Sequence, residues 1–210
     1  MIFRSNPLDL LILLPLFIIS ISFHEAAHAY AAHIFGDDTA AREGRLTLNP
    51  IAHLDLMGAL MVVFVGFGWA KPVPVDPRNL RNPAWQMPAI AAAGPLANLL
   101  LAILSIILLY LGNKTGQDFI KEPLVISISL NLLLMVFNLV PLPPLDGAGV
   151  LRGFLPRRLQ IQFDQLLPYG PAILIALVFL PGVRDIFFGQ IYKVMQVIFE
   201  FLVHLFSFLA

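Results

Sequence analysis

Long apolar runs constrain the fold of this chain more than any other feature of its sequence. Six runs carry few charges, and several approach the ~20 residues with which a helix crosses ~30 Å of hydrocarbon. Only 12% of the 210 residues are charged, against ~25% in a soluble domain. The sequence therefore predicts an all-α polytopic membrane protein, with runs at residues 8–23, 56–70, 87–111, 124–140, 166–180 and 186–210.

Composition also excludes several function classes. Cysteine is absent, which rules out disulfides, thiolate metal ligands and a cysteine nucleophile. The 13 basic and 13 acidic residues balance, and no basic tract is dense enough to indicate nucleic-acid binding. Stretches outside the apolar runs are too short for a separate soluble domain. We therefore expect one membrane-embedded domain over residues 1–210, and the oligomeric state is not encoded.

A His-Glu-x-x-His motif closes the first apolar run. A helix places residues i and i+4 on one face, so His24 and His28 can bind one zinc ion, and Glu25 can act as the general base. Ionisable groups that continue a membrane segment are costly, which favours a functional role. The alternative is a polar cluster at the membrane interface.

A catalytic zinc site normally has a third protein ligand. His33 lies about 140° further round the helix than His28, so it does not join the same face. Residues 138–147 contain three prolines and end in glycine, so the backbone must unwind there and leave Asp146 at the mouth of a cavity. The alternative is an aspartate that caps a helix in a proline-rich turn.

Together these motifs resemble the site-2 protease family of intramembrane zinc metalloproteases. The resemblance implies that His24, His28 and Asp146 hold one Zn²⁺, that Glu25 is the base, and that Asn138 positions the substrate or the oxyanion. It implies a membrane-spanning protein as substrate, and it looks like the compact subgroup without PDZ or CBS domains. The resemblance covers about residues 8–153 and rests on residues 24–28, on 138–147, and on 93–98, which we expect to open a helix.

A shared metal also constrains the topology. The ligands lie at the C-terminal ends of both segments, so the two segments must cross the membrane in the same direction to share one metal. The run at residues 87–111 must then return the chain to the opposite side. Residues 56–70, which lie between, must therefore begin and end on the side of the metal. This run of about 15 residues is short for a span and is interpreted as a re-entrant hairpin. We expect a catalytic core over about residues 8–153, C-terminal helices over about 166–210, and about five transmembrane helices in all. A six-helix arrangement is the alternative, and it would place the ligands on opposite faces.

The distribution of Lys and Arg favours a cytosolic active site. Basic residues are more frequent in cytosolic loops. Eight basic residues lie on the side of the metal ligands: Arg42, Arg45, Lys71, Arg78, Arg81, Arg152, Arg157 and Arg158. The opposite side carries five: Arg4, Lys114, Lys121, Arg184 and Lys193. We expect a multi-pass protein of the plasma membrane.

Other polar and extended segments give weaker signals. Residues 71–75 could form an edge strand in which Val73 and Val75 hold a substrate extended; the alternative is a packed loop. Asn98 could support the site through a hydrogen bond, or simply pack helices. His53 and Asp55 indicate either a second ligand pair or a structural turn.

These observations predict a zinc metalloendopeptidase. An inactive membrane scaffold and a metal-ion transporter are the alternatives. Neither has an evident need for Glu25, which is not a ligand but is suited to take a proton from water.

Overall fold

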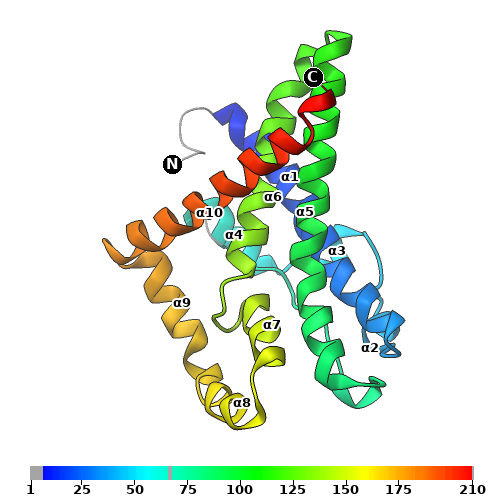
Figure 1. The fold of residues 1–210 in the computed structure, drawn as a ribbon, viewed down its shortest axis with the longest axis vertical. Helices are drawn as coiled ribbons and strands as arrows, with labels where there is room; N and C mark the ends of the chain where they lie inside the picture. The colour runs from blue at the N-terminus through cyan, green and yellow to red at the C-terminus, as the bar shows by residue number, and fades with distance from the viewer. Residues whose placement is uncertain (1–6, 66–67, 210) are drawn as a thin grey trace. The chain divides into compact units, whose positions relative to one another are not determined.

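The structure is a computed structural model that describes residues 7–65 and 68–209, and its regular elements are helices (Figure 1). They are α1 (Pro7–Ile34), α2 (Thr39–Arg42), α3 (Pro50–His53), α4 (Leu56–Val65), η1 (Pro77–Asn79), α5 (Pro83–Thr115), η2 (Asp118–Ile120), α6 (Lys121–Asn138), α7 (Asp146–Phe154), α8 (Arg157–Asp164), η3 (Leu167–Tyr169), α9 (Gly170–Phe179), α10 (Val183–Leu205) and η4 (Ser207–Leu209). The chain divides into two compact units, Met1–Ala97 and Asn98–Ala210.

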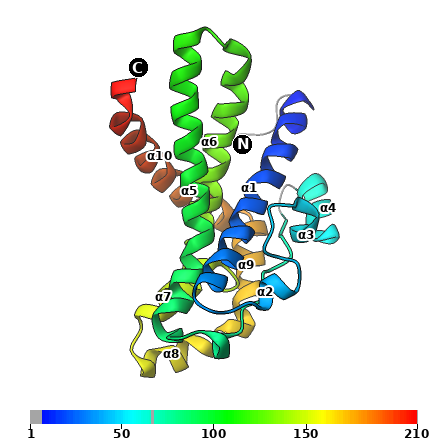
Figure 2. The same ribbon diagram turned by 90° about the vertical axis from the view of Figure 1, so that its right-hand side faces the viewer.

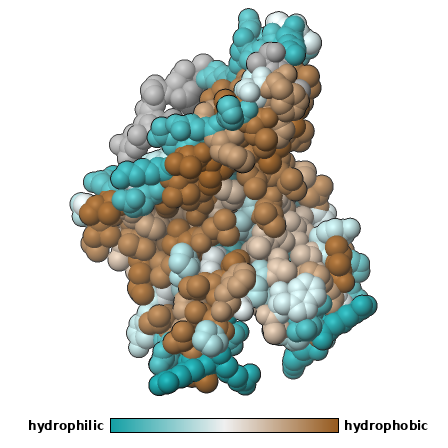
Figure 3. All heavy atoms as spheres, in the orientation of Figure 1, coloured by the Kyte–Doolittle hydropathy of each residue, from teal (hydrophilic) through white to brown (hydrophobic). Residues whose placement is uncertain are grey.

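Five described helical segments are long and apolar enough to cross a membrane. They are Leu11–Ile34, Pro83–Thr115, Asp118–Asn138, Arg157–Phe179 and Val183–Leu205. The prediction of about five spans in an all-α membrane protein is confirmed. Within the second unit, apolar side chains cover the visible face of α9, while hydrophilic ones gather over α8 (Figure 3).

The predicted hairpin over residues 56–70 has the expected closed form. Its helix, α4, has 10 residues, which is about half the length needed for a span. Leu54 and Ala70 form an antiparallel bridge, and the amide of Lys71 donates to the carbonyl of His53 at 2.9 Å. The segment therefore leaves and returns at the same place, as a hairpin must, and the six-helix alternative is not supported.

In the first unit, α1 packs against the short helices α2 and α3 (Figure 2). Asp37, which follows α1, is fully buried. Its carboxylate accepts hydrogen bonds from the amide and hydroxyl of Thr39, from the amide of Asp76 at 2.7 Å, and from the side chain of Asn79 at 2.8 Å. Burial raises the pKa of Asp37, but these hydrogen bonds outweigh it and hold that pKa below its ordinary value.

Asp37→Ala is expected to destabilise this loop network by about 2–4 kcal/mol, because the donors on Thr39, Asp76 and Asn79 lose a buried, charged acceptor. Since the folded-state pKa is lowered, the carboxylate stabilises the fold above pH ~4 and loses this effect as the pH falls further. Thermal unfolding at pH 7 measures the stability lost in Asp37→Ala, and thermal unfolding below pH 4 shows whether the difference between wild type and variant disappears. Asp38→Ala is the matched control, because Asp38 is exposed and contacts the exposed His33; an equal loss in both variants would contradict the prediction.

The second unit has a core built from α6, α10 and the part of α5 that follows Ala97. Buried apolar residues of the three helices pack together: Ala102, Ile106, Ile128, Leu132, Met135, Val136, Ile191, Met195 and Leu202. Polar pairs join α5 to α6. Asn98 donates to Asn131 at 2.9 Å, and the hydroxyls of Ser105 and Ser127 lie 2.8 Å apart. Hydrogen bonds of this kind hold helices together in an apolar environment.

The start of α5 differs from the prediction. We expected Gly94 and Pro95 to open a helix, but α5 begins at Pro83 and continues through Pro88 and Pro95. Proline removes a helical hydrogen bond, yet membrane helices tolerate it where neighbouring groups satisfy the backbone. The stretch from Ala89 to Ala97 is rich in small residues, which allow another helix to approach closely.

Candidate metal centre

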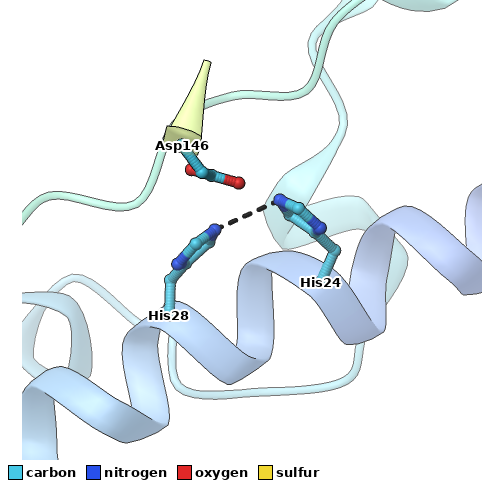
Figure 4. A group of neighbouring side chains, drawn as sticks. All are labelled: His24, His28 and Asp146. Carbon is cyan, nitrogen blue, oxygen red and sulfur yellow. Dashed lines mark hydrogen bonds between the residues drawn. The ribbon is translucent and has the colours of Figure 1, made fainter. Parts of the chain in front are cut away.

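The two histidines of the first motif face each other on α1. His24 and His28 are both buried, with 5% and 8% of their surface exposed. Their Nε2 atoms lie 3.1 Å apart, and their rings stand nearly perpendicular at 80° (Figure 4). Two nitrogens that each lie 2.0–2.1 Å from a tetrahedral zinc ion would be about 3.3 Å apart. The i, i+4 spacing on α1 thus places two imidazoles at a separation suited to a shared metal.

The orientation of His28 is set by α5. Nδ1 of His28 lies 2.7 Å from the carbonyl oxygen of Ile90. A carbonyl oxygen can only accept, so Nδ1 carries the proton and Nε2 presents a lone pair toward His24. A metal-binding histidine usually donates its other ring N–H to such an acceptor, which fixes the tautomer and the ring orientation.

Asp146 is the first residue of α7, after a non-helical turn over residues 139–145. The predicted unwinding therefore occurs where the prolines lie. Gly147 makes this turn possible, because a Cβ at that position would lie 2.2 Å from the carbonyl oxygen of Leu139. The carboxylate also lies in the first turn of a helix, where the helix dipole favours an anion.

His24, His28 and Asp146 form a group that could hold a metal ion. One ligand atom from each lies within 4.8 Å of the other two (Figure 4). Two neutral imidazoles and one carboxylate are a donor set found in catalytic zinc sites, where the fourth position is taken by water or substrate. The residues present thus fit zinc by donor type and by the separation of the two histidines.

Glu25 follows His24 on α1 and is half-buried. On a helix it points about 100° away from His24 and about 60° from His28, on the same half of the cylinder. A carboxylate beside a metal, but outside its ligand set, is suited to take a proton from a water molecule.

The two candidate asparagines lie in the second unit. Asn138 is the last residue of α6, and its side chain donates to the carbonyl of Leu134 at 2.9 Å. Its amide has a second N–H, which such a bond does not use. Asn98 is fully buried and donates to Asn131. Its observed partner favours the helix-packing interpretation.

The predicted edge strand does not form. Residues 71–76 contain neither helix nor strand, because Pro72 and Pro74 have no N–H to donate to a ladder. Val73 is half-buried, and Val75 packs against a buried cluster of Ala32, Leu80 and Ile90. This is the packing expected of a loop, the alternative that the sequence left open.

The remaining polar candidates have structural surroundings. His53 is fully buried with Nε2 2.7 Å from the carbonyl oxygen of Thr47, and Asp55 accepts from the amide of Gly58 at 2.8 Å. His33 contacts Asp38 and is exposed. These contacts favour a hydrogen-bonded turn for His53 and Asp55, and they place His33 at the end of α1, as expected.

Sequence reasoning missed the contribution of Ile90. A backbone carbonyl leaves no trace in a sequence, so the Ile90 contact could not have been found. Gly147, in contrast, was expected from the sequence to permit the turn beside Asp146, and its close approach to the backbone of Leu139 agrees with that expectation.

Comparisons with known proteins found relatives that are described as putative zinc metalloproteases. A Bacillus subtilis (strain 168) protein described as "Putative zinc metalloprotease YwhC" is 41% identical over 171 residues, which cover 78% of each chain. The chain belongs to the site-2 protease family. Two proteins described as "Putative zinc metalloprotease Rip2" are further relatives. The one from Mycolicibacterium smegmatis is 28% identical over 83% of this chain and 69% of its own. The one from Mycobacterium tuberculosis H37Rv is 29% identical over the same shares.

No family model matches the chain, and no solved structure matches it either. Membership of the site-2 protease family therefore rests on these relatives and on the two sequence motifs. The geometry of the site is an independent observation about this chain.

Proposed function

We propose that this chain is a zinc metalloendopeptidase that hydrolyses peptide bonds of membrane-spanning proteins near the cytosolic face of the plasma membrane. The observation that carries the proposal is the group formed by His24, His28 and Asp146, with ligand atoms within 4.8 Å of one another. In this proposal the three residues hold one zinc ion within a single membrane-embedded catalytic domain.

The side chains divide the chemistry among them. Zinc, when bound, lowers the pKa of a water molecule toward ~7 and polarises the carbonyl of the scissile bond. Glu25 takes the proton of the attacking water and returns it to the leaving amine. Asn138, at the end of α6, offers its second amide N–H to the substrate or the oxyanion. Ile90 keeps His28 in the tautomer that binds metal.

A helical substrate must unwind before its carbonyls can be attacked, because they are engaged in its own hydrogen bonds. Val73, in the non-helical segment that follows the hairpin, is the residue we propose for contact with the unwound substrate. Val75 is packed against the cluster of Ala32, Leu80 and Ile90, so it would act by fixing the segment. The excess of Lys and Arg in the loops on this side supports a cytosolic orientation.

Removal of metal tests the proposal directly. Cleavage of a panel of single-span substrates in proteoliposomes is expected to stop after treatment with a chelator and to return when zinc is added. Loss of metal removes both the polarised carbonyl and the activated water, so activity should fall to the background of protein-free liposomes. Cleavage that continues in chain shown to be free of metal would contradict a metalloprotease.

A further inference from the structure

One glycine of α5 lies against both candidate metal ligands. A Cβ built on Gly94 would be 2.3 Å from Nε2 of His28, and 2.6 Å from both Cε1 and Nε2 of His24. Contacts this short do not occur between non-bonded atoms. Residue 94 therefore has to lack a side chain for the two rings to keep this arrangement.

The position of Gly94 on its helix makes the contact informative. It lies four residues after Ile90, so the two residues share a face of α5. Ile90 accepts the Nδ1 proton of His28, and Gly94 meets the Nε2 end of both rings. The helix α5 supplies no metal ligand. One of its faces nevertheless contacts the proton-bearing nitrogen of His28 and the metal-facing nitrogens of both histidines.

The neighbouring rings could not easily yield to a larger residue. His24 and His28 are both buried, at 5% and 8% exposed, and the hydrogen bond to Ile90 fixes one of them at 2.7 Å. A methyl group at residue 94 must displace at least one ring or push α5 away from α1. Either change alters the separation of the two Nε2 atoms, whereas the ligand distances of a zinc site are expected to lie within about 0.2 Å of their usual values.

We propose that Gly94 is a positioning residue of the metal centre, which keeps the space beside both Nε2 atoms clear so that His24 and His28 can bind one metal ion. The proposal rests on the proposed function, because it assumes that these histidines hold the metal. It assigns to a non-ligand residue a direct effect on metal affinity.

The first test is zinc binding to Gly94→Ala in the purified full-length chain. We expect its zinc affinity to fall by about 10–100-fold or more, which is the loss typical of disturbed outer-shell groups around a metal. Gly189→Ala is the matched control, since a Cβ on Gly189, in α10, meets nothing within 4 Å. The control should bind zinc as the wild type does. Cobalt substitution gives a second readout, because the visible absorption of Co²⁺ reports the geometry of its ligands.

A double-mutant cycle keeps the proposal testable if Gly94→Ala is poorly stable. In metal-free protein, Gly94→Ala should lower the Tm of the wild type. It should lower the Tm by less than half as much in a chain that carries both His24→Ala and His28→Ala, because the clashing rings are gone. Residues in contact show such coupling, whereas independent sites are additive. Equal Tm losses in both backgrounds would overturn the proposed contact.

The outcomes separate the two proposals. If the wild type binds no zinc, the proposed function fails. If the wild type and Gly94→Ala bind zinc equally well, the proposed function stands and the role of Gly94 is wrong. Both proposals are supported if Gly94→Ala binds zinc more weakly than the wild type, Gly189→Ala binds it equally well, and the Tm loss caused by Gly94→Ala is smaller in the chain without the two histidines.

Discussion

Glu25→Gln is expected to retain zinc and to lose peptide-bond cleavage by about 10²–10⁴-fold, the range over which a positioned acid–base group accelerates a reaction. Glutamine has nearly the same shape as glutamate, so the helix and the two histidines that flank it should stay in place. It cannot accept a proton from water at neutral pH, and this is the step assigned to Glu25. Cleavage rates of a single-span substrate in proteoliposomes, with zinc measured on the same sample, report the two properties separately.

Glu200→Gln is the control for this substitution. Glu200 lies in α10 and accepts a hydrogen bond from Gln196 at 2.9 Å, on an exposed part of the helix. The Glu200→Gln variant should therefore cleave the substrate at the wild-type rate. Wild-type cleavage by Glu25→Gln would remove the general base from the mechanism. Loss of zinc from Glu25→Gln would instead show that Glu25 acts on the metal ligands, and the base would have to be another group.

Asp146→Ala is expected to weaken zinc binding by more than about 100-fold, since even the loss of an outer-shell partner costs 10–100-fold. Alanine supplies no oxygen, so only two nitrogen ligands would remain for the ion. Cleavage should be lost with the metal. Competition with a chromogenic chelator measures the zinc affinity of the wild type and of the variant.

The control for Asp146→Ala is Asp185→Ala. Asp185 lies in the first turn of α10, as Asp146 lies in the first turn of α7, and its side chain is 71% exposed. It therefore tests whether loss of an acidic residue at a helix start is enough to change zinc binding. If Asp146→Ala holds zinc as tightly as the wild type, the third ligand lies elsewhere, and the assignment of Asp146 is wrong.

The parts of the site that follow from local geometry could be predicted from the sequence. His24 and His28 are four residues apart on a helix, and no tertiary information is needed to place them on one face. The prolines between Asn138 and Asp146 cannot continue a helix, so the unwound turn before α7 was also predictable. The short hairpin over residues 56–70 followed from its length, because an apolar run of about 15 residues is short for a membrane span.

The features that depend on packing between distant segments could not be predicted. The bond from His28 to the carbonyl of Ile90 joins residues 62 positions apart. The close approach of Gly94 to the histidine rings arises from the same packing of α1 and α5. The passage of α5 through Pro95 was predicted wrongly, because proline signals a helix end locally while the surrounding structure can override that signal.

Zinc content of the purified chain tests the central claim most directly. Elemental analysis should find about one zinc per wild-type chain. It should find little or none in His24→Ala, His28→Ala or Asp146→Ala, provided that each variant keeps its helical circular dichroism. A wild-type chain without zinc, or folded variants that each retain a full equivalent, would contradict the account that these three residues form the metal centre of an intramembrane protease.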